Sequence, residues 1–219
     1  MTLERTLLPA STRRGRNTRR DLVEAARAVF ERDGYLDARI TDIATEAGVA
    51  HGTFYAHFRS KPEVFLAVMT DLWSRLAVPA PAEDHTVTPY ERVLASNSHF
   101  LAGYRDNARL FAVVEQAATT LEDIQALRSK IHTDNATRVA RAIRRWQREG
   151  IAAADVHPGD AATALISMAG RSAYYWYVVE QRRTTRSEAE TLTRLWLRGL
   201  GITVPGKLTR RRDRQTAGG

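Results

Sequence analysis

The chain has 219 residues, 43% hydrophobic and 26% charged, and its formal net charge is +8. This composition excludes a mainly disordered chain, and the absence of cysteine excludes a disulfide framework, a thiolate zinc site and a cysteine nucleophile. No stretch approaches the roughly 18 apolar residues of a membrane span, so we expect a cytoplasmic protein.

The positive charge is concentrated at the two ends of the chain. Residues 1–20 contain six arginines and one glutamate, and residues 205–219 contain five basic residues and one aspartate. Residues 21–204 carry a net charge of −1. We therefore predict a basic N-terminal arm at 1–17 and a basic C-terminal tail at 205–219, and a solvated end is the simplest role for such a run.

Helical periodicity dominates between these ends. A first helix is indicated by apolar residues spaced i, i+3, i+4, i+7, i+8, with Asn17 or Thr18 as its N-cap and Gly34 as its end. Two short helices are expected at 41–47 and 52–58, separated by a turn at Gly48. Ser60 and Glu63 have the spacing of a capping box, which predicts a linking helix over 62–77.

A loop rich in proline, alanine and acidic residues at 78–88 separates a second helical region. Capping boxes are expected at Thr88–Glu91 and at Ser187–Glu190. Helical patterns begin after Thr88 and continue at about 107–118, 121–148, 159–182 and 188–199. The sequence thus predicts an all-α protein of about nine helices, with a three-helix N-terminal domain over 18–77 and a larger helical domain over 78–204.

The two short helices have helix-turn-helix spacing. Small residues at Ala44 and Ala47 suit a close helix crossing, and Phe54 and Phe58 are expected to point into the core. Such pairs around a glycine turn also occur in many helical proteins that bind no DNA. The second helix would present polar and small residues to a major groove at His51, Gly52, Thr53, Tyr55 and His57.

The flanking sequence makes the interpretation more specific. F-x-x-x-G-Y at 30–35, I-A-x-x-A-G-V at 43–49 and G-T-F-Y-x-H-F-x-S-K at 52–61 lie within Thr18 to Met69. This segment resembles the DNA-binding region of the tetracycline-repressor (TetR) family of bacterial transcription regulators. The resemblance implies base contacts from His51, Gly52 and Thr53, and phosphate contacts from Thr41, Tyr55, His57 and Lys61. Ala50 departs from the family, which often has a capping Ser or Thr there.

Charge within the motif region is unfavourable for DNA. Residues 21–76 contain six basic and nine acidic residues. Because phosphate neutralisation supplies much of the affinity for DNA, we predict that an arm before the first helix contributes the missing charge. Its candidate residues are Arg13, Arg14, Arg16 and Arg19.

The larger domain contains no catalytic or metal-binding motif, so we expect no cofactor, no metal and no enzymatic activity. The resemblance implies a small-molecule pocket and a homodimer formed by the last two helices. We expect a largely apolar or aromatic effector in a pocket lined by Asn97, Phe100, Tyr104, Phe111, Gln116, Asn135, Trp146 and Arg171. The dimer interface would include Leu165, Met168, Ser172, Trp176, Leu192, Leu195 and Trp196.

These expectations define a homodimeric regulator, most often a repressor in this family, that binds a near-palindromic DNA operator and is released by a small molecule. Activation of transcription stays open as an alternative. Two further alternatives are a DNA-binding regulator without an effector and a helical enzyme.

Overall fold

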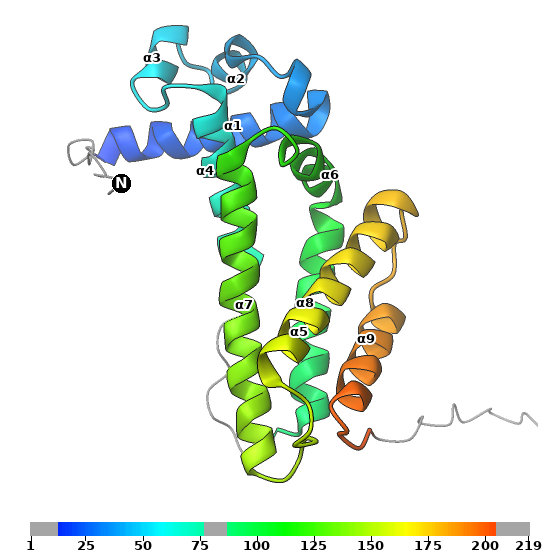
Figure 1. Cartoon of the computed structure of the whole chain (residues 1–219). Helices are drawn as coiled ribbons and strands as arrows, with labels where there is room; N and C mark the ends of the chain where they lie inside the picture. Colours follow the sequence, from blue (N-terminus) through cyan, green and yellow to red (C-terminus); the bar gives the residue numbers. More distant parts are fainter. Residues whose placement is uncertain (1–12, 77–86, 205–219) are drawn as a thin grey trace, which may run out of the picture.

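A computed structural model describes residues 13–76 and 87–204 of the chain (Figure 1). The described residues form nine α-helices and one π-helical segment and contain no strand, which confirms the all-α fold. None of the described helices is long and apolar enough to cross a membrane. The elements are α1 (Arg13–Asp37), α2 (Ile40–Glu46), α3 (His51–Tyr55), α4 (Lys61–Leu76), α5 (Pro89–Asp106), α6 (Ala108–Ala117), α7 (Glu122–Arg148), α8 (Pro158–Ala173), η1 (Tyr174–Val179) and α9 (Arg186–Gly199).

Helix α1 begins earlier than the sequence predicts. We expected an arm up to residue 17 and a helix cap at Asn17 or Thr18, but residues 13–17 are already helical. Arginine is a good helix former, so an arginine-rich run extends the helix where a capping residue alone would suggest its start. Residues 1–12 of the predicted arm and the tail at 205–219 lie outside the described residues. Near the other end, Gly34 interrupts the helix as expected, with φ 77°.

An aromatic core holds the N-terminal domain together. Phe30 and Tyr35 of α1 pack on Phe65 of α4, with ring centroids 4.8 and 5.0 Å from that of Phe65. Phe54 and Phe58 are fully buried, as their four-residue spacing predicts. These contacts fix α1, α3 and α4 relative to one another, and they leave the opposite face of α3 exposed.

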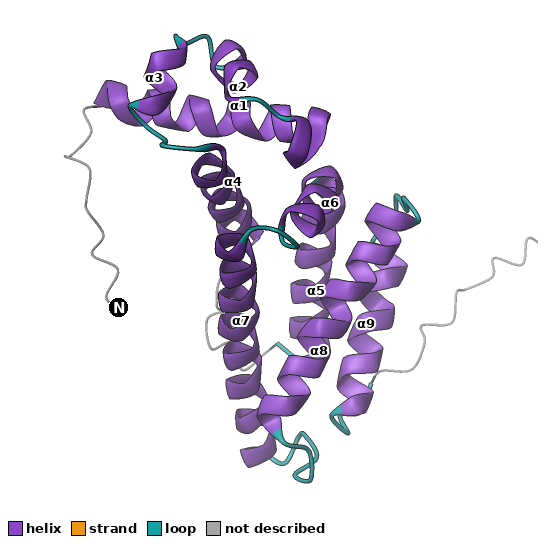
Figure 2. Ribbon diagram, turned by 45° about the horizontal axis from the view of Figure 1, so that its top comes forward, coloured by secondary structure: helices purple, strands orange, loops and turns teal. Residues whose placement is uncertain are grey.

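The larger domain is built around α5. In Figure 2, α5 lies among the long helices, with α9 along one side, and it contacts α4, α6, α8, η1 and α9. Helix α7 packs along α8, and α6 lies against α1 and η1. The N-terminal domain therefore rests on the larger domain through α4 and through the contact between α1 and α6 (Figure 1).

Helix ends show which capping predictions hold. The Thr88 hydroxyl accepts a hydrogen bond from the Glu91 N–H and the Glu91 carboxylate accepts one from the Thr88 N–H, so that capping box is confirmed. The box at Ser187–Glu190 is wrong, because α9 starts at Arg186 and Ser187 donates to Glu188 instead. The helix expected at 159–182 is divided, because it changes to π-helical geometry at Tyr174 and ends at Val179.

Candidate nucleic-acid interface

A tight turn joins α2 to α3. Gly48 adopts φ 65°, a left-handed conformation that favours glycine. The N–H of Val49 donates to the carbonyl of Ala44 at 3.0 Å, which closes the end of α2 against the turn. Ile43 and Ala44 are buried where the helices cross. The predicted helix-turn-helix geometry is therefore present.

Helix α3 carries the expected residues on its outer face. His51, Gly52 and Tyr55 are exposed, while Thr53 and His57 are half-buried. The rings of His51 and Tyr55 lie edge to face, with centroids 5.2 Å apart. Thr41 is exposed at the start of α2. Side chains from the start of α2 and from α3 are thus accessible to solvent, and contact with base edges and phosphates is what such polar groups can make.

The start of α3 lacks a side-chain cap. Its N-cap is Ala50, and no side chain bonds to the free N–H groups of the first turn. In this turn the Thr53 N–H donates a backbone hydrogen bond to the Ala50 carbonyl at 2.8 Å. A capping Ser or Thr would typically add about 1 kcal/mol, so this short helix depends on its buried Phe54 for its position.

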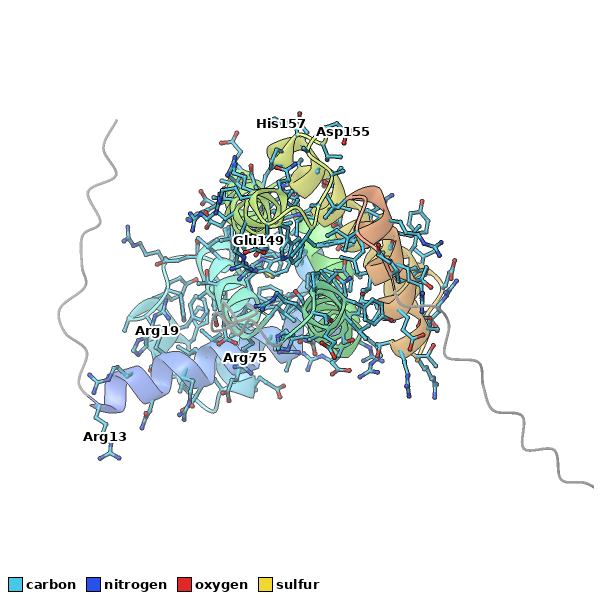
Figure 3. The ribbon with its side chains drawn as sticks, turned by 90° about the horizontal axis from the view of Figure 1, so that it is seen from below. Arg13, Arg19, Arg75, Glu149, Asp155 and His157 are labelled. Atoms are coloured by element: carbon cyan, nitrogen blue, oxygen red, sulfur yellow. The ribbon has the colours of Figure 1, made fainter. Side chains whose placement is uncertain are left out.

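The basic run predicted as an arm forms the first turns of α1. No acidic residue lies in the first turn, although negative charge is the kind that a helix N-terminus favours. Arg13 lies at the free end of the helix and points away from the body of the protein (Figure 3). Arg16 is exposed on the same helix, and the side chain of Arg14 lies outside the described residues. The structure therefore places this charge on a helix.

Arg19 has a different environment from the other arginines of this run. Its guanidinium carbon lies 4.6 Å from the centre of the Phe58 ring, a cation–π contact between α1 and the segment after α3. The side chain remains exposed. Arg19 thus links α1 to the helix-turn-helix and still presents a positive charge on the surface near α3.

Lys61, for which the resemblance implies a phosphate contact, makes several contacts within the protein. Its Nζ donates to the carbonyl oxygens of Tyr35 at 2.9 Å, of Leu36 at 3.0 Å and of Ala38 at 3.0 Å. It also lies 4.8 Å from the centre of the Tyr35 ring. An ammonium group has three N–H donors, and three carbonyls already receive them. Burial lowers the pKa of Lys61. The three donors of the Lys61 ammonium group are therefore taken up by carbonyls of the protein itself.

Three of the expected pocket residues lie together but fill the core. Tyr104 and Phe111 are buried, and their rings stack with centroids 3.7 Å apart and planes 4° apart. Phe100 lies edge-on to Tyr104 at 5.8 Å, and Trp73 of α4 lies 5.0 Å from Phe111. These rings occupy the space between α4, α5 and α6. That these residues line an effector pocket between the helices stays a prediction.

The other expected pocket residues are scattered. Asn97 is buried and donates to the Thr193 hydroxyl at 3.1 Å, joining α5 to α9. Asn135 accepts from Arg138 on the same helix, and Arg171 lies over the rings of Tyr174 and Tyr175. The two remaining residues are Trp146, which is buried near the end of α7, and Gln116, which is exposed on α6.

An open hollow lies where α1 meets the junction of α5 and α6. It has a volume of about 530 Å³, within the range of small-molecule sites. Arg27 of α1 donates to the Asn107 side chain there at 2.5 Å and pairs with Glu31 at 2.9 Å. Sequence periodicity gave no signal for this site because its polar groups come from three separate segments. Its lining is Glu31, Arg105, Asp106, Asn107, Ala108, Arg109, Ala112, Tyr177, Val178 and Gln181.

The expected dimer residues divide into two groups. Leu192 and Trp196 are only 1% and 8% exposed, so the chain itself covers them, largely through the packing of α9 on α5, and they offer little to a partner. Leu195, on the other side of α9, is 52% exposed. Leu165, Met168, Ser172 and Trp176 are half-buried. Apolar exposure extends to Tyr175 and Val179 of η1, which the sequence interpretation did not include.

Among residues 13–76 and 87–204, no group of three or more histidine, aspartate or glutamate side chains is arranged to hold a metal ion. In the hollow beside Arg27, positive and negative groups lie close together. Its geometry suits hydrogen bonding.

Comparison with known proteins supports the helix-turn-helix assignment. Residues 22–68 match the family described as "Bacterial regulatory proteins, tetR family". The HTH-type transcriptional regulator TtgW of Pseudomonas putida is 43% identical over 54 residues, which are 25% of this chain and 40% of TtgW. The alignments with the curated relatives span between 24% and 40% of those proteins' lengths.

Solved structures are similar over most of the chain. MexZ, described as a key repressor responsible for antibiotic resistance in Pseudomonas aeruginosa, has a TM-score of 0.67 and 23% identity, with 87% of this chain and 97% of MexZ covered. NalD of the same organism, described as the secondary repressor of the MexAB-OprM multidrug efflux pump, has a TM-score of 0.68 and 19% identity, with 86% and 98% covered. At these identities the likeness establishes the fold of both domains.

Proposed function

Because this chain belongs to the tetR family of bacterial regulatory proteins, we propose that it is a transcription regulator that binds operator DNA through α2 and α3. The observation that carries the proposal is the exposed face of α3, where His51, Gly52 and Tyr55 stand outward over the fully buried Phe54. A recognition helix needs both an exposed face that contacts the bases and an opposite face that is packed on the protein core.

The basic first turns of α1 supply the electrostatic part of the proposal. Residues 21–76 are net acidic, so the helix-turn-helix region alone is a poor partner for a polyanion. Arg13 and Arg16 are exposed at the end of α1 and supply charge beside that region. We propose that these two arginines contact backbone phosphates from a rigid helix and not from a flexible arm.

We further propose that the protein acts as a homodimer. Leu195, Tyr175 and Val179 are exposed apolar side chains at the outer side of α9 and η1, where a partner would bury them. A two-fold dimer would present two copies of α3 to successive major grooves, roughly 34 Å apart, and would favour a near-palindromic operator. Repression is the mode that we propose, by analogy with MexZ and NalD, which are described as repressors.

A small-molecule effector is the finer part of the proposal. The hollow beside Arg27 joins the DNA-binding domain to α5, α6 and η1, so a molecule bound there would contact both domains. Its lining combines the apolar Ala112 and Val178 with charged and amide groups. We therefore propose an effector with apolar surface and a few polar groups. We place it in this hollow because the aromatic residues first expected to receive it are packed against one another.

Selection of binding sites from a pool of random DNA duplexes tests the DNA-binding proposal. We expect recovery of a near-palindromic sequence that His51→Ala and Thr53→Ala variants bind at least about tenfold more weakly, the cost of a lost base contact. Ser74→Ala is the matched control, because Ser74 is exposed on α4 and donates to the Asp71 carbonyl in its own helix. Enrichment of no sequence, or equal binding by all three variants, would contradict the proposal.

Thermal-shift screening with small molecules tests the effector proposal. We expect a stabilising compound to weaken operator binding, and an Ala112→Trp substitution, which fills the hollow, to abolish both effects. A regulator without an effector is the alternative. It would be favoured if stabilising compounds left operator binding unchanged. An intact effect in Ala112→Trp would instead contradict the hollow as the effector's binding site.

A further inference from the structure

Lys61 lies at the position where the helix-turn-helix joins the linking helix. It is the first residue of α4, and its side chain reaches back to the end of α1, more than twenty residues earlier in the chain. Everything between these two points belongs to α2, the turn, α3 and their connections. The contact therefore closes the segment that carries the recognition helix.

The three carbonyl oxygens around Lys61 satisfy its donors. Tyr35, Leu36 and Ala38 provide them, at 2.9 to 3.0 Å from Nζ. These carbonyls lie at and beyond the last helical turn of α1, after the break at Gly34, where backbone acceptors lose their partners within the helix. A cation near a helix C-terminus also interacts favourably with the helix dipole. The ammonium group of Lys61, which is carried on α4, thus caps the C-terminal end of α1.

The surroundings make this contact stiff. Tyr35 is buried, stacks on Phe30 and contacts Phe65, and the centre of its ring lies 4.8 Å from Lys61 Nζ. Lys61 is therefore anchored on the aromatic core and not on a mobile loop. Hydrogen bonds to a charged donor are about twice as strong as neutral ones, and partial burial protects them from water.

We propose that Lys61 is a positioning residue. By joining the start of α4 to the end of α1, it holds together the two ends of the helix-turn-helix segment and so fixes α3 for DNA recognition, without contacting DNA itself. We call this set of hydrogen bonds the clasp. Phosphate contact would require the ammonium group to give up carbonyls of the folded domain. The consequence for recognition rests on the proposed DNA-binding function. The clasp itself can be tested in the free protein.

Charge-conserving substitution separates a clasp from a phosphate contact. Three carbonyls arranged around one point fit a compact ammonium, whereas guanidinium is planar and larger. In the DNA-free protein, we expect Lys61→Arg and Lys61→Met both to lower the thermal midpoint by roughly 3–10 °C. A phosphate ligand would behave differently, because both variants would keep the wild-type midpoint.

Binding to a mixed-sequence duplex of 20 base pairs supplies the second measurement. We expect the dependence of log K on log salt to be unchanged in Lys61→Arg and Lys61→Met, while Arg13→Gln lowers the slope by about 0.9 as one phosphate contact is lost. Discrimination between the selected operator and this duplex should fall about tenfold in both Lys61 variants.

The opposite pattern would overturn the proposal. It consists of an unchanged midpoint, a slope reduced by about 0.9 in Lys61→Met, and wild-type behaviour of Lys61→Arg. Failure of the wild-type chain to bind any duplex would instead contradict the proposed function. In that case the midpoints of the free variants would still decide whether the clasp exists.

Discussion

The two domains differ in how completely their buried polar groups are satisfied. In α1, α2 and α3 no described buried side-chain nitrogen or oxygen is without a partner, and the core is a compact set of aromatic rings. Two of the three described atoms without a partner, Tyr177 Oη and Trp196 Nε1, lie in the larger domain. The third, Trp73 Nε1, lies on α4, where Trp73 packs on Phe111 of the larger domain. Unsatisfied buried groups typically cost about 1–3 kcal/mol each.

Backbone geometry shows the same contrast. The larger domain includes the π-helical turn at Tyr174–Val179, and Gln181 just after it has φ 52°, the one described non-glycine residue with positive φ. π-Helical turns are rare and occur often at functional sites. These features lie beside the hollow at the contact with α1. Among the described residues, these departures from regular backbone geometry therefore lie in the larger domain, next to its contact with α1.

The largest expected effect concerns the aromatic core of the N-terminal domain. Phe65→Ala removes a fully buried ring that contacts Phe30 and Tyr35, and should lower the free energy of unfolding by about 3–5 kcal/mol. Urea unfolding measures the change. Thr70→Ala, at an exposed position of the same helix, should stay within about 0.5 kcal/mol of wild type. A loss below about 1 kcal/mol for Phe65→Ala would show that this core is looser than described.

A smaller loss is expected for the buried polar link in the larger domain. Asn97→Ala leaves the Thr193 hydroxyl without its partner and should cost about 1–3 kcal/mol in the same unfolding experiment. The double variant Asn97→Leu with Thr193→Val removes both polar groups, so it should recover most of the loss. If the double variant is no more stable than Asn97→Ala, the hydrogen bond is not the source of the effect.

The capping box at the start of α5 gives a pH-dependent prediction. Thr88→Ala should cost about 1 kcal/mol at neutral pH. Hydrogen bonds from Thr88 lower the pKa of Glu91 below its ordinary 4.5. Stability from this carboxylate is therefore present above about pH 4.5 and is lost as pH falls through the lower folded-state pKa. Unfolding at pH 7 and pH 3 should show the variant closer to wild type at pH 3; an equal difference at both would refute the link.

The smallest expected effect has the opposite sign. Tyr177→Phe removes a buried hydroxyl that has no partner, and burial raises the pKa of this group to about 12. We expect the variant to be as stable as wild type or more stable by up to about 1 kcal/mol. Thermal unfolding provides the measurement. A loss of more than 1 kcal/mol would mean that the hydroxyl is satisfied in solution, which would weaken the contrast between the domains.

Local patterns predicted the N-terminal domain well. The spacing of Phe54 and Phe58, the turn at Gly48 and the missing cap at Ala50 depend on residues close in sequence, and all three appear in the structure. The contacts of Lys61 could not be predicted in this way, because their acceptors are backbone carbonyls brought near by the fold.

The larger domain shows where periodicity stops being informative. An apolar stripe on α9 indicates that Leu192 and Trp196 are covered, but not whether α5 or a second chain covers them. The same holds for Tyr104 and Phe111, since their spacing predicts burial equally for a filled core and for a closed pocket wall. The hollow at α1 combines residues from α1, α5, α6 and η1, which are far apart in the sequence, so it leaves no periodic pattern.

Half-site spacing tests the central claim, that a dimer reads DNA through two copies of α3. Fluorescence anisotropy would compare the selected operator with a version carrying five additional base pairs between its half-sites, which turns one half-site by about half a helical turn. The account predicts that affinity for the altered operator falls to that for a mixed-sequence duplex. Unchanged affinity would contradict it, because the two recognition helices could not then be engaging both half-sites together.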